Sequence, residues 1–151
     1  MIALLQRVLE ASVRIEGSTT GAIGQGLVVL IGFESDDTSA MLPRLLQRIL
    51  GYRIFEDEAG RMNRSLADVR GGLLLVPQFT LAADTSSGMR PGFSTAATPA
   101  DGARLFDELA GLAAQAHDDV SCGSFGAHMQ VHLVNDGPAT FWLQLKPKSK
   151  A

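Results

Sequence analysis

The side chains best suited to nucleophilic catalysis stand alone in this sequence. Cys122 is the one cysteine, and it lies beside Gly123 with no fixed partner, so we interpret it as structural. Thr80 carries a hydroxyl, but no base is visibly arranged to remove its proton. Neither a Ser-His-acid combination nor a glycine-rich phosphate loop stands out. These residues therefore point away from a side-chain nucleophile.

Ionisable residues form two small groups that would suit metal or acid–base chemistry. The run Glu56–Glu58 is closed by Gly60, and no hydrophobic pocket beside it would separate the pKa values, so an exposed turn is expected. His128 and His132 share one face of a segment with period two and lack the Glu of a zinc-protease helix. His117 is expected to interact with a helix C-terminus. The sequence predicts no metal site and no cofactor.

A six-residue stretch, Asn135 to Thr140, interrupts an otherwise apolar C-terminal region. Residues 128–133 alternate polar with apolar, and residues 141–145 resume a strand-like run. Asn-Asp-Gly is common turn chemistry, and Pro138 has no N–H for a strand ladder. From the residues alone, this stretch is a turn between the two strands of a hairpin.

A second stretch, residues 71–81, combines a buried strand with a polar end. Leu73–Val76 has the pattern of the strand, which stops at Pro77 and leads into Gln-Phe-Thr-Leu. Residues 82–97 follow without periodicity, and long loops in compact domains are usually disordered or functional. We therefore expect this loop to form a wall or lid of a site, with Arg90 as its best phosphate or carboxylate contact.

Apolar patterns predict the elements that position these stretches. Strands are expected at 2–15, 27–33, 52–55 and 73–76, with a short helical turn or loop at 63–70. One helix is expected to begin at a Ser39 cap and to end at Gly51. A second has Thr98 as its cap, Pro99 as its first residue and Asp101 as the capping-box partner. Two main helices among roughly seven strands predict a single α/β domain with mixed or antiparallel sheets.

Length and charge limit the possible partners. The 151 residues fit one domain spanning 1–151, and residues 146–151 are expected to form a flexible tail. A net charge of −3 argues against gripping a long phosphate backbone, because that requires many Lys and Arg contacts. No DNA partner is expected, and any RNA contact should be short. With a single cysteine, no leader and no long apolar span, the sequence predicts a cytoplasmic protein without a membrane partner.

Taken together and in this order, the two stretches resemble the D-aminoacyl-tRNA deacylase family. That family carries a Ser-Gln-Phe-Thr-Leu type motif and a Gly-Pro motif near the C-terminus. The corresponding residues here are 77–81 and 135–140. The resemblance runs from Met1 to about Leu145, and its other parts are Gln6-Arg7-Val8, residues 24–32, residues 52–57 and Arg90-Pro91-Gly92-Phe93.

The resemblance implies a deacylase-like fold and a hydrolase that needs no cofactor. Its substrate would be the 3′ end of D-aminoacyl-tRNA, and also glycyl-tRNA mischarged on tRNA-Ala. Backbone N–H groups of Phe79 and Thr80 would stabilise the oxyanion while the ribose hydroxyl or a water attacks, and Gln78 of the same motif would also belong to the catalytic residues. The Thr80 side chain would then shape the pocket rather than act as nucleophile.

The resemblance also implies a homodimer that discriminates by exclusion. The peptide between Gly137 and Pro138 would be cis and would enter the site of the partner, where it leaves no room for an L side chain. Arg7 and Met129 would help to hold this peptide. Pro77 departs from the family, in which Ser is typical, and this departure puts a polar role at that position in doubt.

Two other functions are compatible with the residues. In one, the protein is a non-catalytic, β-rich assembly domain whose two loops build a dimer interface. In the other, it is a small-molecule esterase that uses Thr80. Ester loss from D- and L-tyrosyl-tRNA, with and without a chelator, separates these hypotheses from chiral proofreading.

Overall fold

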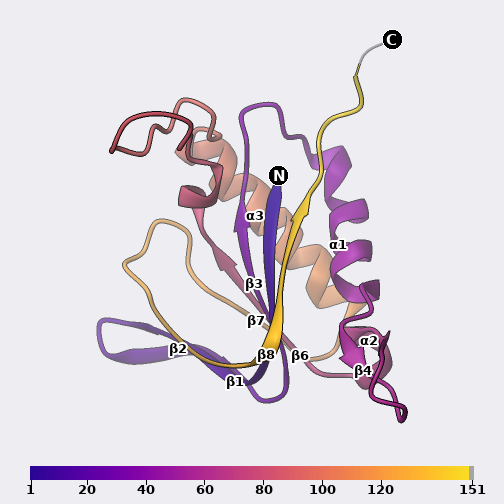
Figure 1. Cartoon of the computed structure of the whole chain (residues 1–151). Helices are drawn as coiled ribbons and strands as arrows, with labels where there is room; N and C mark the ends of the chain where they lie inside the picture. Colours follow the sequence, from indigo (N-terminus) through magenta and orange to yellow (C-terminus); the bar gives the residue numbers. More distant parts are fainter. Residues whose placement is uncertain (150–151) are drawn as a thin grey trace.

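A single mixed sheet organises the chain, which a computed structural model describes over residues 1–149 (Figure 1). Its strand order is β2-β1-β3-β6-β7, and β8 pairs with β1. The strands are β1 Ile2–Ile15, β2 Ser18–Ile23, β3 Gly26–Gly32, β6 Gly72–Pro77, β7 Val120–Cys122 and β8 Gln130–Gln144. The strands β3, β6 and β7 are parallel, whereas β1 is antiparallel to β2, β3 and β8. The expected mixed α/β architecture is confirmed.

The two central strands, β3 and β6, are apolar on both faces because both faces are covered. Alternate residues such as Val29 and Leu75 belong to a cluster that includes the buried sides of helices α1, Leu42–Gly51, and α3, Pro99–Ala116. Their neighbours Val28 and Leu74 belong to a second cluster with β1 and β2. A period of two along each strand thus distributes side chains between two cores.

Both main helices follow their apolar stripes, but their starts differ. In α3, the Thr98 hydroxyl accepts a hydrogen bond from the Asp101 N–H at 3.2 Å, and Pro99 is the first residue, as expected. In α1, the expected Ser39 cap is wrong. Ser39 lies inside a 3₁₀ turn, η1 Ser39–Met41, and its hydroxyl accepts a hydrogen bond from Arg104 at 2.9 Å instead.

The connection between α1 and β6 is less regular than the sequence suggests. The expected strand at 52–55 is wrong except at its end, because the Tyr52 N–H still bonds to Arg48 and closes the helix. Only β4, Phe55–Glu56, pairs, with β5, Met62–Arg64. A short helix, α2 Leu66–Val69, follows, so the helical turn or loop expected at 63–70 is confirmed as a helical turn, except that residues 63 and 64 belong to β5.

The acidic run in this connection is an exposed turn, as expected. The Asp57 carboxylate accepts hydrogen bonds from the N–H groups of Ala59 and Arg61 and from the Asn63 amide. These bonds, the one from Asn63 above all, hold the Asp57 pKa below its usual value. This carboxylate therefore serves the turn and is not poised for acid–base chemistry.

The prediction of a C-terminal hairpin is wrong, because β8 is one strand of 15 residues that pairs along β1. Thr140 pairs with Gln6 and Asn135 pairs with Val8, so Asp136–Ala139 stand opposite the single residue Arg7. Such an excess of residues is a bulge, which bends a strand without ending it. The stretch that reads as a turn is therefore a bulge within a continuous strand.

Candidate active site

The first candidate segment lies where β6 ends. Pro77 is buried opposite Ile31 of β3, and the Gln78 N–H donates to the Ile31 carbonyl at 2.7 Å. The chain then enters a 3₁₀ helix, η2 Phe79–Ala82, whose first N–H groups have no acceptor within the helix. Phe79 and Thr80 therefore offer backbone donors at an exposed turn.

The hydroxyl of Thr80 has an amide as its partner. The Gln78 Nε2 donates a hydrogen bond to Thr80 Oγ1 at 2.6 Å. An amide N–H does not accept a proton, so this contact orients the hydroxyl without activating it. The side chains of Gln78 and Thr80 therefore suit positioning, whereas the N–H groups suit stabilisation of a developing oxyanion.

A hollow of about 590 Å³ opens beside this turn. Its wall combines Thr80 with Trp142 and Gln144 of β8 and with Glu34, which follows β3. Three exposed aromatic side chains lie in these segments: Phe79 is 53% exposed, Phe93 44% and Trp142 54%. The rings of Phe79 and Phe93 pack at 5.2 Å between centroids. Of these three rings, Trp142 lines the hollow.

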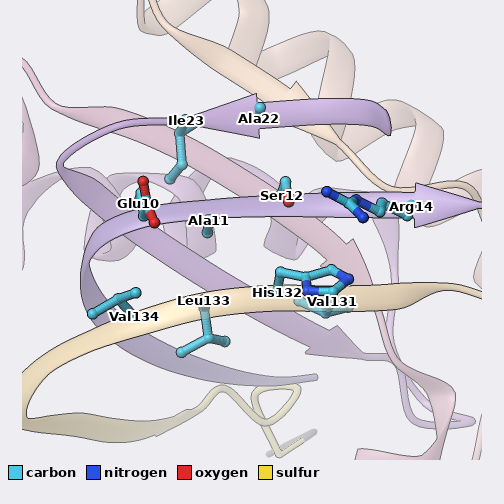
Figure 2. A pocket seen from close by; sticks show the side chains of 10 residues that line it. All are labelled: Glu10, Ala11, Ser12, Arg14, Ala22, Ile23, Val131, His132, Leu133 and Val134. Carbon is cyan, nitrogen blue, oxygen red and sulfur yellow. The ribbon is translucent and has the colours of Figure 1, made fainter. Parts of the chain in front are cut away.

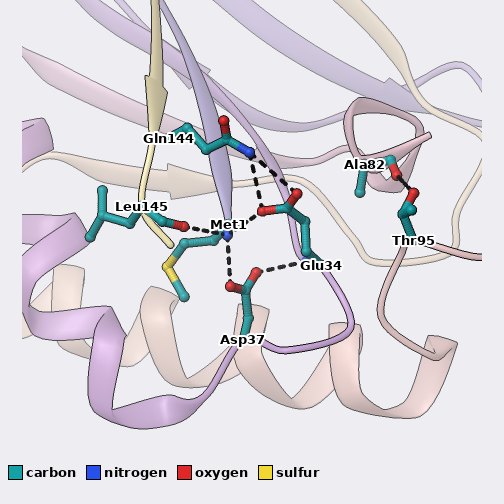
Figure 3. Close-up of polar contacts among 7 residues, drawn as sticks. All are labelled: Met1, Glu34, Asp37, Ala82, Thr95, Gln144 and Leu145. Carbon is teal, nitrogen blue, oxygen red and sulfur yellow. Dashed lines mark hydrogen bonds and ion pairs between the residues drawn. The ribbon is translucent and has the colours of Figure 1, made fainter. Parts of the chain in front are cut away.

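The N-terminal ammonium of Met1 holds Glu34, which lines this hollow (Figure 3). The buried ammonium of Met1 contacts Glu34 at 2.9 Å, Asp37 at 2.7 Å and the Leu145 carbonyl at 2.9 Å. Gln144 donates to the same Glu34 carboxylate. Glu34 is therefore held as a structural acceptor, which makes it a poor general base.

The loop after η2 is pinned at both ends. Asp84 and Gly92 exchange two backbone hydrogen bonds, of 2.7 and 3.0 Å. The Thr95 hydroxyl donates to the Ala82 carbonyl at 2.6 Å (Figure 3). The predicted wall is thus a folded loop that lines the hollow. Arg90 is exposed in this loop, and its contact with a phosphate or carboxylate stays a prediction.

The second candidate segment is the bulge of β8. Arg7 is 6% exposed, and its Nε and Nη1 donate to the carbonyls of Asp136, at 3.0 Å, and Ile54, at 2.8 Å. The Asn135 amide donates to the Arg7 carbonyl at 3.1 Å. The Gly137–Pro138 bond is cis, as the resemblance implies. A Cβ on Gly137 would lie 2.5 Å from Asn135 Oδ1, so glycine fits here because no larger residue does.

Met129 lies beside the first segment and not beside the bulge of its own chain. A Cβ on Gly123 would stand 2.7 Å from the Met129 sulfur and 3.1 Å from Pro77 Cδ, so both side chains border Gly123. Of the two residues expected to hold Gly137, Arg7 contacts that segment through Asp136.

One chain does not bring the two segments together. Pro77 pairs with Ile31, which pairs with Ala3, whereas the bulge stands opposite Arg7. Three strand spacings of about 4.8 Å across the sheet and four residues of about 3.4 Å along it separate them by about 20 Å. Figure 1 agrees, since the segment after β6 lies at the upper left and the middle of β8 near the bottom. A site containing both segments requires a second chain.

Other candidates carry less chemistry. Burial raises the pKa of the Cys122 thiol, with a smaller effect from Asp107, so a thiolate is disfavoured. His117 lies 2.6 Å from the Gly71 carbonyl through its Nε2. A hollow of about 670 Å³ lies along β1, β2 and β8 and is lined by residues that include Glu10, Arg14 and His132 (Figure 2). No group of three potential metal ligands occurs within residues 1–149.

Sequence reasoning missed the residues that depend on strand register. Asn135 reads as a turn residue, and only its pairing with Val8 shows that its amide ties the bulge to Arg7. Trp142 and Gln144 read as ordinary strand residues, and their place in the hollow depends on the pairing of β8 with β1. The spacing of Asn135 two residues before Gly137 is the one local signal that was available.

Solved structures define the class of fold. The chain of a structure titled "c-Myc DNA Unwinding Element Binding Protein" superposes with a TM-score of 0.92 at 35% identity, covering 97% of this chain and 100% of that one. A probable eukaryotic D-amino acid tRNA deacylase superposes with a TM-score of 0.84 at 20% identity, covering 94% and 97%, which concerns the fold alone.

Sequence relatives then define the family. The family model described as D-Tyr-tRNA(Tyr) deacylase matches residues 4–144. D-aminoacyl-tRNA deacylases from Thioalkalivibrio sulfidiphilus and Alkalilimnicola ehrlichii are 65% and 58% identical, covering 97% and 99% of this chain and 99% of each relative. The chain belongs to the D-Tyr-tRNA(Tyr) deacylase family and is a hydrolase of carboxylic ester bonds. Within the described part of the chain, no helix has the length and apolarity to span a bilayer.

Proposed function

We propose that this protein hydrolyses the ester bond of D-aminoacyl-tRNA and releases free tRNA and the D-amino acid. Family membership supports the reaction class. The observation that carries the chemistry is the exposed turn at Phe79 and Thr80, which begins a 3₁₀ helix next to a hollow lined by Thr80, while the Thr80 hydroxyl is bound to an amide.

In this mechanism the backbone stabilises charge that develops on the substrate. Water adds to the aminoacyl carbonyl carbon. The bond between that carbon and the ribose oxygen then breaks, and the ribose oxygen takes up a proton. The N–H groups of Phe79 and Thr80 donate to the carbonyl oxygen as it becomes an oxyanion, which contributes about 3–4 kcal/mol for one well-placed donor. An aminoacyl ester is already activated, so no side-chain nucleophile is required.

The active unit in this proposal is a homodimer in which the bulge of one chain enters the hollow of the other. The separation of about 20 Å within one chain supports this arrangement. Exposed apolar side chains also mark both segments. Leu9 and Val134, 54% and 44% exposed, flank the bulge, whereas Phe79 and Trp142 flank the hollow. Mutual covering of these surfaces would bury them in a two-fold interface. Met129 would then meet the partner's bulge.

Discrimination follows from the small size of the bulge at Gly137. A backbone wall beside the substrate α-carbon admits hydrogen on that side and collides with an L side chain, whereas a D side chain points elsewhere. Glycine has no side chain, so the same wall admits a glycyl ester. We therefore include glycyl-tRNA mischarged on tRNA-Ala among the proposed substrates.

The test compares D-tyrosyl-tRNA, L-tyrosyl-tRNA and glycyl-tRNA, each with and without a chelator. The proposal predicts rapid ester loss from the D and glycyl substrates, loss from the L substrate at the uncatalysed rate, and no effect of the chelator. Equal rates for D and L esters would contradict the stereochemical mechanism. Hydrolysis of small esters with no tRNA ester loss would favour the esterase hypothesis.

A further inference from the structure

The lysines of this chain are confined to its end. All three fall within the last six residues, at 146, 148 and 150. The structure describes the first two, which are exposed and follow β8. Together with Arg44 of α1, Lys146 and Lys148 line a hollow of about 400 Å³. The rest of its lining is uncharged and consists of Thr38, Ala40, Met41, Leu145 and Pro147.

The charge of this hollow, which we call the basic hollow, is not neutralised by the described chain. Within residues 1–149, no carboxylate forms an ion pair with Arg44, Lys146 or Lys148. Glu34 and Asp37, which precede the hollow in sequence, are both bound to the Met1 ammonium. Three cations therefore face one concave surface, in a protein whose net charge is −3.

The basic hollow lies next to the hollow at Thr80. Gln144 lines the Thr80 hollow, and Lys146 follows it by two residues, so their Cα atoms are at most about 7 Å apart. Glu34 lines the Thr80 hollow and Thr38 the basic one. Figure 1 shows the C-terminal segment, the start of α1 and the segment after β6 at the same end of the sheet.

We propose that the basic hollow binds backbone phosphates of the tRNA close to its aminoacylated 3′ end. This inference rests on the proposed function and extends it from the ester to the RNA. Ammonium and guanidinium groups bind phosphate through charge-assisted hydrogen bonds, and a few such contacts make a short RNA interface compatible with a negative net charge. The family model ends at residue 144, so Lys146 and Lys148 lie outside the segment it matches.

The test removes the two lysines and keeps a matched control. K146A/K148A and R53A/R61A lower the formal charge by the same amount, and the control arginines are exposed near β4, at the opposite end of the sheet (Figure 1). Each variant is assayed with D-tyrosyl-tRNA and with D-tyrosyl adenosine ester, which carries no phosphate.

For K146A/K148A, kcat/KM on tRNA should fall on the order of tenfold. The plot of log(kcat/KM) against the logarithm of the salt concentration should become less steep, its slope decreasing in magnitude by about two. Its activity on the adenosine ester should equal that of the wild type. The control variant should keep both wild-type values. Equal losses on the two substrates, or equal effects of the two variants on tRNA, would overturn the proposed phosphate contact.

A binding measurement separates failure of this inference from failure of the proposed function. A wild-type protein that hydrolyses neither substrate would contradict the function. The affinity for a fluorescent acceptor-stem RNA that carries no aminoacyl group then tests the basic hollow alone. K146A/K148A should bind this RNA about tenfold more weakly than R53A/R61A at low salt, and equal affinities would refute the contact.

Discussion

The bulge at Gly137 and the turn at Thr80 differ in how firmly a single chain holds them. Around the bulge, the 6% exposed Arg7 donates to two backbone carbonyls, and Asn135 donates to the Arg7 carbonyl. Around the turn, Phe79 is 53% exposed, and the 3₁₀ helix is held mainly by its backbone. In the proposed dimer, the bulge would act as a preformed wedge and the turn as an open receptor. A firmly held bulge and an exposed turn are compatible with a site shared between two chains.

The largest expected effect comes from enlarging the wedge. In Gly137→Ala, the new Cβ would meet Asn135 Oδ1 at 2.5 Å and would narrow the passage for the substrate. We expect kcat/KM for D-tyrosyl-tRNA to fall on the order of 100-fold, with a loss of about 1–2 kcal/mol in the free energy of unfolding from overpacking. A deacylation time course measures kcat/KM, and urea unfolding measures the free energy of unfolding.

Gly111→Ala is the matched control, because this glycine lies inside α3 with open space around its Cβ position. That variant should gain about 0.5–1 kcal/mol in stability and keep full activity. If Gly137→Ala keeps wild-type activity, the wedge does not act on the substrate.

Removing the support of the wedge should have the next largest effect. Arg7→Ala leaves the carbonyls of Asp136 and Ile54 without their donor. We expect the free energy of unfolding to fall by about 2–4 kcal/mol and kcat/KM to fall on the order of tenfold. Arg7→Lys should restore part of the stability because it keeps one charged donor. If Arg7→Ala lowers stability without changing the ratio of D to L hydrolysis, Arg7 supports the fold but does not position the wedge.

Changes to a side chain of the receptor should matter less, because the proposed mechanism uses the backbone N–H groups of this turn. Thr80→Ala removes the hydroxyl that accepts from Gln78 and leaves both N–H groups in place. We expect kcat to fall by less than about fivefold, well short of the 100-fold or more that loss of an oxyanion donor causes. Single-turnover deacylation measures this step. A fall to the uncatalysed rate in a folded variant would contradict this expectation and favour the Thr80 hydroxyl as the nucleophile.

The smallest effect is expected at Pro77, which is buried in β6 and borders Gly123. Pro77→Ser restores the residue typical of the family and should keep kcat/KM within about twofold. The free energy of unfolding of this variant, measured by thermal or urea unfolding, should fall by about 1 kcal/mol because a hydroxyl is buried. A collapse of activity would mean that this pocket is built differently from that of the family.

Local chemistry in the sequence predicts features that depend on neighbouring residues. The cap of α3 follows from Thr98 and Asp101, and the turn at Asp57 follows from its flanking residues. Features that depend on pairing partners are not encoded locally. The alternating patterns on both sides of Pro138 suit a hairpin as well as a bulged strand, and only the 14 residues of β1 decide for the strand.

The same limit applies to the site. Phe79, Thr80 and Gly137 belong to contiguous motifs, so a sequence resemblance finds them. Trp142 and Gln144 join Thr80 only because β1 and β3 lie between β8 and β6 in a fixed register. That arrangement is a property of the folded sheet and leaves no signature within either segment.

The central claim, that wedge and receptor meet across two chains, is tested most directly by mixing two inactive variants. Gly137→Ala damages the wedge, whereas Thr80→Pro removes an N–H of the receptor. In a mixed dimer, one site combines the intact receptor of the first chain with the intact wedge of the second. We predict that refolding the two in equal amounts restores about a quarter of wild-type deacylation, because half the dimers are mixed and each has one intact site. If both segments served the same chain, every site would keep one defect, and the mixture would stay as inactive as its components.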